Sequence, residues 1–226
     1  MPTKLEKGNK GEEAVINALS YLVDSFILLN NVTFLNKKSN ITHQIDHILI
    51  HPYGVFVIET KAYTGKIIYD EFLDAWIREA KGKQFKIKSP LKQNKSHEIA
   101  LYRVLKGAIK VIGVVVFANN NAPYMGDENV INLSDLVLFV KSFPYERILS
   151  QEEMIKIKDI IKENEVHVDT SKHLENIKSL KEANKIAIKE KTYAIENMRC
   201  PRCGGTIKKK KYTYSCSNCD FKFCLD

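Results

Sequence analysis

Residues 44–63 read QIDHILIHPYGVFVIETKAY, and this stretch determines the fold class. Two runs rich in β-branched and apolar residues flank the tetrad at residues 51–54, which predicts a β-hairpin that closes on Pro52 and Tyr53. Counted outward from this turn, the expected opposed pairs are Ile50–Val55, Ile48–Val57, Asp46–Glu59 and Gln44–Lys61. The hairpin therefore sets two acids against each other on strands that otherwise look like core.

The charged side chains of this hairpin share one face. Side chains alternate between the two faces of a strand, so Asp46, Glu59 and Lys61 point the same way. Opposed like charges destabilise a sheet, and burial of an unpaired carboxylate costs far more. The two acids need a counter-charge, which Lys61 supplies and a divalent cation would supply more strongly. The alternative is a solvated sheet edge at which Lys61 simply pairs with the acids.

A third acid, Glu12, lies on the first predicted helix, residues 9–23. It is in phase with the apolar stripe of that helix, whose members are Val15, Ile16, Leu19, Leu22 and Val23. Glu12 is thereby directed toward the core. A capping box, with Asn9 as the N-cap and Glu12 at the third helical position, explains the same residue without any chemistry.

The remaining pattern predicts a mixed α/β domain. Val111–Phe117 is a continuous apolar run, as expected for a strand that helices cover on both faces. The other expected elements are a strand at 26–35, short strands at 65–69 and around Trp76, and helices at 89–106, 134–143 and from Ser150, where Glu153 completes a capping box. Antiparallel strands come first, and a later strand returns after a helical crossover.

Length and charge bound the function. The chain has 226 residues, enough for one ordinary domain and a small appendage, and its net charge of +8 favours a polyanionic partner such as nucleic acid. No run approaches the roughly 18 apolar residues of a membrane span, and the start, MPTKLEKGNKGEE, is too polar for a secretory signal. We therefore expect a cytoplasmic protein without membrane association.

The acids and the lysine carry a family resemblance. Asp46, followed by Glu59-Thr60-Lys61 and preceded by an acid on the first helix, resembles the PD-(D/E)XK nuclease superfamily, and more closely its nuclease-related domain, NERD. The matching stretches are GNKGEEAV (8–15), QIDHILIHPYGVFVIETKAYTGKI (44–67) and SPLKQNKSHEIALYRVL (89–105). Ile45 replaces the proline that usually precedes the first acid, at a position that varies in the superfamily. The resemblance implies a restriction-endonuclease-like mixed sheet flanked by helices.

The resemblance also implies a metal site. Asp46 and Glu59 would bind Mg²⁺ or Mn²⁺, the Thr60 carbonyl would be a further ligand, and Glu12 would complete the acidic cluster. Hard cations prefer such oxygen ligands. The rival interpretation is a zinc site made by His43, Asp46 and His47, which strand alternation disfavours because His47 points away from Asp46.

The same resemblance implies catalytic roles for two further side chains. Lys61 would position or deprotonate the attacking water and offset charge on the phosphate. Gln93 would orient the water, the metal shell or the DNA backbone. His97 shares a helical face with Gln93, four residues apart, but a packing role explains it equally simply.

All five cysteines follow residue 199. Two CxxC knuckles, Cys200–Cys203 and Cys216–Cys219, are separated by twelve residues, which is the spacing of a zinc ribbon. So short a tail has little other core, so we expect Zn²⁺ to drive its folding. Free or redox-active cysteines are the alternative, and the role of the fifth thiol, Cys224, is left open.

The tail resembles the zinc ribbons at topoisomerase C-termini, which implies DNA binding. Its seven basic and two acidic side chains, combined with Zn²⁺ and four thiolates, give a net charge of about +3. The candidate DNA contacts are Lys208, Lys209, Lys210, Lys211, Tyr212 and Tyr214, with Phe221 and Phe223 as further stacking rings. A solvated basic strand with aromatic packing around the zinc, or a protein contact, explains the same residues.

The sequence thus predicts a nuclease-like domain at 1–145, a helical spacer at 146–197 and a Cys₄ zinc ribbon at 198–226. Residues 150–197 of this spacer are nearly neutral, with nine basic and ten acidic side chains. The favoured function is a metal-dependent DNA nuclease. The alternatives are a non-cleaving nucleic-acid-binding adaptor and a protein-interaction module that acts through the ribbon.

The pattern leaves open whether the substrate is double-stranded DNA, single-stranded DNA or RNA, and whether cutting is endo- or exonucleolytic. Cutting both strands would be simpler for a homodimer.

Overall fold

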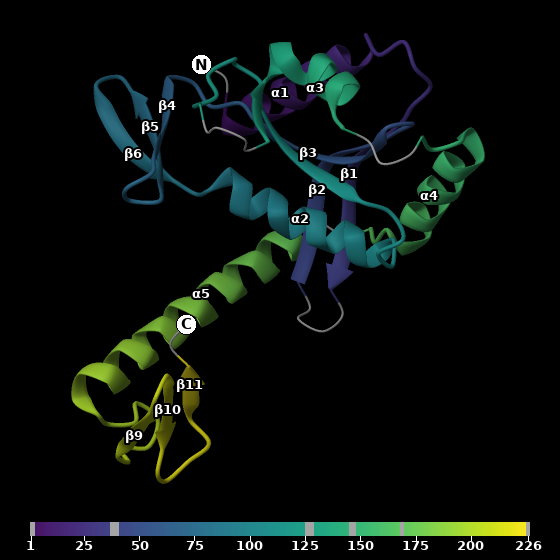
Figure 1. Ribbon diagram of the computed structural model, residues 1–226. Coiled ribbons are helices and arrows are strands. Elements are labelled where there is room, and N and C mark those ends of the chain that lie inside the picture. Colours follow the sequence, from purple (N-terminus) through teal and green to yellow (C-terminus); the bar gives the residue numbers. More distant parts are fainter. Residues whose placement is uncertain (1–2, 37–40, 125–128, 145–147, 168–169, 225–226) are drawn as a thin grey trace. The chain divides into compact units, whose positions relative to one another are not determined.

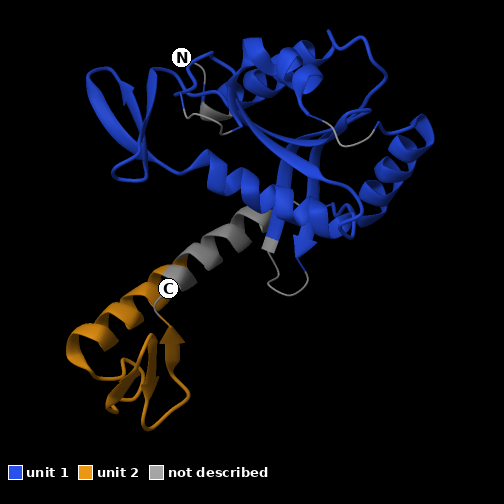
Figure 2. Cartoon of the chain, in the orientation of Figure 1, with its two compact units in different colours: residues 1–167 blue, residues 168–226 orange. Residues whose placement is uncertain are grey.

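The computed structural model describes residues 3–36, 41–124, 129–144, 148–167 and 170–224 (Figure 1). The chain forms two compact units, residues 1–167 and residues 168–226 (Figure 2). We call them unit 1 and unit 2 and describe each by itself.

Unit 1 is built on a five-stranded mixed sheet. In sheet order its strands are β1 (Ile27–Asn36), β2 (Ile41–His51), β3 (Gly54–Lys61), β7 (Val111–Phe117) and β8 (Val130–Asn132). The first three are antiparallel, whereas β7 runs parallel to β3 and β8 runs parallel to β7. This confirms the predicted mixed α/β sheet and adds β8, a three-residue strand that the sequence analysis did not predict.

The hairpin register is confirmed near the turn and is wrong further out. Ile50 pairs with Val55 and Ile48 with Val57, but the β2–β3 ladder ends at His47–Ile58. Beyond that point β2 continues along β1 and β3 continues along β7, so the two strands follow different neighbours. The expected Asp46–Glu59 and Gln44–Lys61 pairs are therefore not ladder pairs.

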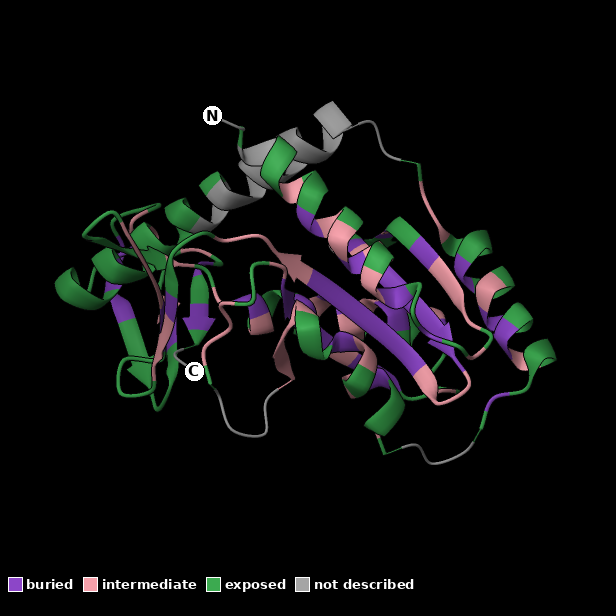
Figure 3. Ribbon diagram, turned by 90° about the horizontal axis from the view of Figure 1, so that it is seen from above, coloured by how far each residue is buried: buried purple, intermediate pink, exposed green. Residues whose placement is uncertain are grey.

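Helices cover both faces of the sheet (Figure 1), and the strands between them are buried (Figure 3). On one face, α1 (Lys4–Leu19) and α3 (Leu136–Ser142) enclose a core that includes Phe56 and Ile58. On the other face, α2 (Pro90–Val104) and α4 (Gln151–Asn164) pack near Val55 and Val57. Because alternate β3 residues enter different cores, Glu59 points toward the α2 side, in phase with Val57.

Helix α1 begins earlier than predicted. Thr3 is the N-cap, and its hydroxyl and the Glu6 carboxylate form the capping box. The capping box proposed between Asn9 and Glu12 is therefore wrong, because both residues lie within the helix. The helix ends at Leu19, and Val23, which the predicted stripe included, is 85% exposed.

Helix α4 belongs to unit 1. Its predicted capping box is confirmed, since Ser150 Oγ accepts from the Glu153 N–H and Glu153 caps the Ser150 N–H in return. The helix buries one face, formed by Met154, Ile157 and Ile161, in the core beneath β1 and β2. This packing separates α4 from the spacer in which the sequence analysis had placed it.

The predicted helix 134–143 consists of two parts. A short 3₁₀ helix at Leu133–Asp135 leads directly into α3.

Between β3 and α2 in the sequence, the chain forms an additional small sheet. Its strands, in order, are β4 (Lys66–Asp70), β5 (Ala75–Ala80) and β6 (Lys83–Ile87), of which β6 was not predicted. We call residues 66–87 the inserted sheet. Trp76 anchors it, because this ring is 2% exposed and stacks on Phe117 with centroids 6.2 Å apart.

Unit 2 comprises α5 (Thr170–Asn197) and a three-stranded sheet. In sheet order its strands are β11 (Lys222–Cys224), β10 (Thr213–Cys216) and β9 (Ile207–Lys210). A small core joins helix and sheet, formed by Ala194, Cys200, Ile207, Tyr214, Phe221 and Phe223. Across both units, the described helices include none that is long and apolar enough to cross a membrane.

Candidate active site and zinc centre

Glu59 is the centre of the candidate active site. It lies near the C-terminal end of β3, and its side chain is 2% exposed. Its Oε1 accepts hydrogen bonds from Lys61 Nζ and, at 2.7 Å, from Gln93 Nε2 at the start of α2. Lys61 Nζ also donates to Gln93 Oε1 at 3.2 Å. Three of the five predicted catalytic side chains, Glu59, Lys61 and Gln93, therefore form one closed hydrogen-bonded group.

His97 approaches the other oxygen of the same carboxylate. One helical turn after Gln93, its Nδ1 lies 3.1 Å from Glu59 Oε2. This contact is within ion-pair distance, although its angles fall outside strict hydrogen-bond geometry. Burial raises the pKa of Glu59, but His97 and Lys61 outweigh burial and hold this pKa below its ordinary value. Glu59 is therefore a carboxylate at neutral pH.

Asp46 is held beside this group by the backbone. The Thr60 N–H donates to Asp46 Oδ2 at 2.8 Å, where β2 and β3 part. Burial, reinforced by the charges of Glu59 and Glu12, raises the pKa of Asp46 to about 7, although the Thr60 N–H and Lys61 act in the opposite direction. Without a cation, this carboxyl group is therefore partly protonated at neutral pH.

Glu12 reaches the same electrostatic environment because α1 packs closely on the end of β3. A Cβ at Gly11 would lie 2.9 Å from the Ala62 Cβ, so only glycine permits this approach. Glu12 follows on the helix and is partly buried. Burial and the charge of Glu59 raise its pKa, while a hydrogen bond with the Asn31 side chain lowers it.

The residues fit a hard divalent cation, although they do not form a closed cage. Glu59 offers a buried carboxylate whose Oε2 lies outside the hydrogen bonds with Lys61 and Gln93, and burial, together with the charges of Glu59 and Glu12, raises the pKa of Asp46. Carboxylates and water are the ligands that Mg²⁺ prefers. In the part of the chain that the structure describes, the only cluster of three or more His, Cys, Asp or Glu ligand atoms within 4.8 Å is the cysteine group. Glu12, Asp46 and Glu59 are thus more widely spaced than a preformed three-acid site.

The rival zinc interpretation does not fit. His47 lies on the opposite face, fully buried, with Nδ1 2.8 Å from Asn30 Oδ1. Burial lowers the pKa of His47 to about 4. His43 Nδ1 lies 3.2 Å from Ser96 Oγ. The two histidines therefore have other partners and do not assemble around Asp46.

One residue that supports the site was missed by the sequence analysis. Asn94 is 3% exposed, and its Nδ2 donates to the Val57 carbonyl at 3.2 Å. This bond fixes the first turn of α2 against β3, two residues before Glu59. A signal was present, because Asn94 is a polar residue in phase with His97 and Leu101 on the buried stripe of α2.

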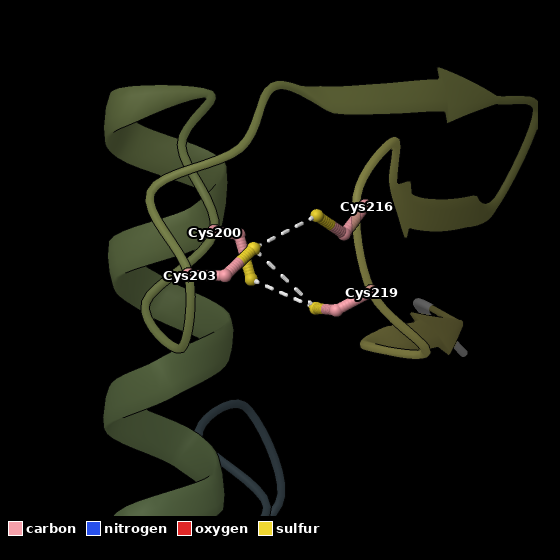
Figure 4. Close-up of side chains that lie close together, drawn as sticks. All are labelled: Cys200, Cys203, Cys216 and Cys219. Atoms are coloured by element: carbon pink, nitrogen blue, oxygen red, sulfur yellow. Dashed lines mark hydrogen bonds between the residues drawn. The ribbon is translucent and has the colours of Figure 1, made fainter.

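The four knuckle cysteines gather in unit 2 (Figure 4). Cys203 Sγ lies 3.5 Å from Cys216 Sγ and 3.5 Å from Cys219 Sγ, and the Cys200–Cys219 distance is 3.6 Å. A tetrahedron with Zn–S bonds of about 2.3 Å has edges of about 3.8 Å, so the arrangement suits zinc. The Asn218 N–H donates to Cys216 Sγ and, against burial, lowers the pKa of this thiol to about 7. Four cysteines are therefore positioned to bind one metal ion.

The aromatic residues of the ribbon divide into two groups. Tyr212 is 74% exposed, and its role as a DNA contact stays a prediction. Tyr214 is 4% exposed and stacks on Phe223, with ring centroids 5.0 Å apart, and Phe221 is equally buried. The predicted stacking role of Tyr214, Phe221 and Phe223 is therefore wrong, because these rings form the core that the short tail needs.

The lysines of the ribbon are exposed as expected. Four exposed lysines lie along β9 and the turn after it: Lys208, Lys209, Lys210 and Lys211. The fifth thiol, Cys224, lies outside the metal-binding group, 3.7 Å from Thr213 Oγ1.

The mixed sheet is consistent with the comparison with protein families. The family described as NERD, nuclease-related domain, matches residues 7–118, so the chain contains a nuclease-related domain that runs from α1 through β7 and covers every predicted catalytic residue. An uncharacterized protein of Bacillus anthracis is 28% identical over 172 residues, which cover 74% of this chain and 81% of that one. No solved structure matches the chain.

Proposed function

We propose that this chain is a metal-dependent DNA nuclease that hydrolyses phosphodiester bonds. One observation carries the proposal: Glu59, Lys61 and Gln93 form a closed hydrogen-bonded group beside Asp46, whose pKa is raised by burial and by the neighbouring charges of Glu59 and Glu12. A domain that needed only its fold would gain nothing from two carboxylates buried together.

Asp46 and Glu59 would hold Mg²⁺ or Mn²⁺, with Glu12 near enough to add negative charge and the Thr60 carbonyl as a further candidate ligand. When bound, the ion would lower the pKa of a water molecule and balance charge on the reacting phosphate. Glu59 contributes a full negative charge at neutral pH, and Asp46 would release its remaining proton in favour of the cation.

Lys61 is suited to act on the water or the phosphate. An ammonium group has three N–H donors, and two of them bond Glu59 and Gln93. The third is available to a substrate oxygen. Gln93 acts as a positioning residue, because its amide accepts from Lys61 and donates to Glu59 at the same time.

The ribbon would assist by binding DNA through Lys208–Lys211 and Tyr212. Four neighbouring ammonium groups attract a phosphate backbone, and an exposed tyrosine ring can stack on a base. A protein contact through the same exposed strand is the alternative. A cytoplasmic location and a homodimer remain predictions.

The test is a cleavage assay on plasmid and on labelled linear single- and double-stranded DNA. Wild type, Asp46→Ala and Lys61→Ala are compared with Mg²⁺, Mn²⁺ and EDTA. We expect metal-dependent cutting that both substitutions abolish, while DNA binding persists. If DNA is bound but never cut by the wild type, the chain is a nucleic-acid-binding adaptor instead.

A further inference from the structure

A run of lysines leads along the inserted sheet to the candidate active site. Residues 81–95 read KGKQFKIKSPLKQNK and contain six lysines but no aspartate or glutamate. The run covers the β5–β6 turn, strand β6 and the first turn of α2, and it includes Gln93, which contacts Glu59 and Lys61. The positive charge is therefore continuous in sequence with the catalytic group.

Four of these lysines are exposed and available. Strand β6 is an edge of the inserted sheet, and residues 81–86 and Lys88 are exposed. Lys92 and Lys95 pair with Asp74 and Glu98, at 2.7 and 2.6 Å. Within the residues that the structure describes, none of Lys81, Lys83, Lys86 and Lys88 forms an ion pair.

Side-chain contacts fix the inserted sheet at both of its ends. Trp76 stacks on Phe117 of β7, and Asp74 accepts from both Lys92 and the Tyr69 hydroxyl. At the other end of the inserted sheet, Arg78 Nε donates to the Thr64 carbonyl at 2.6 Å. A surface fixed at both ends can bind an extended ligand without a large ordering cost.

The dimensions and chemistry suit a nucleic-acid strand. At about 3.3 Å per residue, Lys83 to Lys88 span about 17 Å, which corresponds to about five nucleotides of one strand. Phe85 lies on the same edge strand, 48% exposed, and offers a ring for stacking. Lysines also protect edge strands from aggregation, but protection does not require a run that continues into the active site.

We infer that β6 and its flanking lysines, Lys81 to Lys88, form the track that guides the substrate strand to Glu59, Lys61 and Gln93. This inference rests on the proposed nuclease function. It assigns the inserted sheet as the substrate-binding surface of unit 1, separate from the ribbon of unit 2.

The test compares two triple variants of the full chain. Lys83→Gln/Lys86→Gln/Lys88→Gln removes the track, and Lys106→Gln/Lys141→Gln/Lys156→Gln removes three exposed lysines elsewhere on unit 1. Affinity for labelled 30-nucleotide single strands and 30-base-pair duplexes is measured by anisotropy between 50 and 200 mM salt without Mg²⁺ or Mn²⁺. Thermal melting confirms that both variants fold.

We expect the track variant to lose at least about tenfold in affinity and the control less than about twofold. The slope of log K against log salt should fall by about 2 for single strands, because three phosphate contacts are lost. Lys→Arg at the same three positions should retain wild-type affinity.

The outcomes separate the two proposals. If the wild type binds and cuts DNA while the track variant matches the control, the track is wrong and the nuclease proposal stands. If the wild type neither binds nor cuts DNA, both are wrong. If the track variant binds DNA normally but loses binding to a protein partner at β6, the track inference is likewise wrong.

Discussion

The two candidate metal sites are built in opposite ways. The cysteine site takes four ligands from two short knuckles, and three pairs of its sulfur atoms lie 3.5 to 3.6 Å apart. The carboxylate site takes its side chains from α1, β2, β3 and α2, and Lys61 and His97 offset the charge of Glu59. A closed tetrahedral set of ligands is typical of structural zinc, whereas a site with few protein ligands leaves positions for water and substrate. The comparison teaches that the first metal should hold a fold together and the second should perform chemistry.

The largest expected effect is loss of the ribbon fold without zinc. Cys200→Ser removes a ligand from a core of six residues, so we expect the bound zinc to be lost and residues 198–224 to become protease-sensitive. Structural zinc contributes on the order of 10 kcal/mol in small zinc peptides. Metal analysis and limited proteolysis measure this effect.

Cys224→Ser is the matched control, because Cys224 lies outside the four-sulfur group. It should keep one zinc per chain. A Cys200→Ser protein that retains both zinc and protease resistance would remove the distinction between the two sites.

A smaller effect, a gain rather than a loss of stability, is expected when Asp46 is replaced. Its folded-state pKa of about 7 lies above the ordinary value of 3.8, so the folded protein keeps a proton that the unfolded chain releases. Stability therefore falls as pH rises from about 4 to 7, and the full cost persists above pH 7. Asp46→Asn should raise the free energy of unfolding by about 2 to 4 kcal/mol at pH 8 and by little at pH 4.

Trp76 fluorescence during urea unfolding measures this change in unit 1, because Trp76 is the one tryptophan of the chain and is buried there. Mg²⁺ should stabilise the wild type and leave Asp46→Asn unchanged. Equal stability of the two proteins at pH 8 without Mg²⁺ would contradict an unbalanced charge at this site.

The smallest effect is expected at Glu12. It adds negative charge to the site without belonging to the closed group around Glu59, so Glu12→Gln should lower the cleavage rate by about tenfold, or about 1.4 kcal/mol. Glu13→Gln, at the exposed neighbouring position, should cleave at the wild-type rate. Equal rates for the two variants would leave Glu12 with a packing role only.

The sequence by itself determined the features that depend on neighbouring residues. The turn at 51–54 and the alternation beside it fixed the pairing of Ile50 with Val55, because register is set locally by turn and pleat. The CxxC spacing predicted the cysteine cluster for the same reason, since each knuckle is a short local turn.

Only the tertiary structure decided how distant segments meet. Asp46 and Glu59 are not opposed, because β2 follows β1 and β3 follows β7 beyond the end of their own ladder. Likewise, α4 packs on the sheet of unit 1 and Tyr214 packs in the ribbon core, although both lie in polar stretches of sequence. Burial of apolar surface stabilises these positions. The pKa of Asp46 depends on burial and on charges from two other elements, α1 and β3, and no local pattern carries that information.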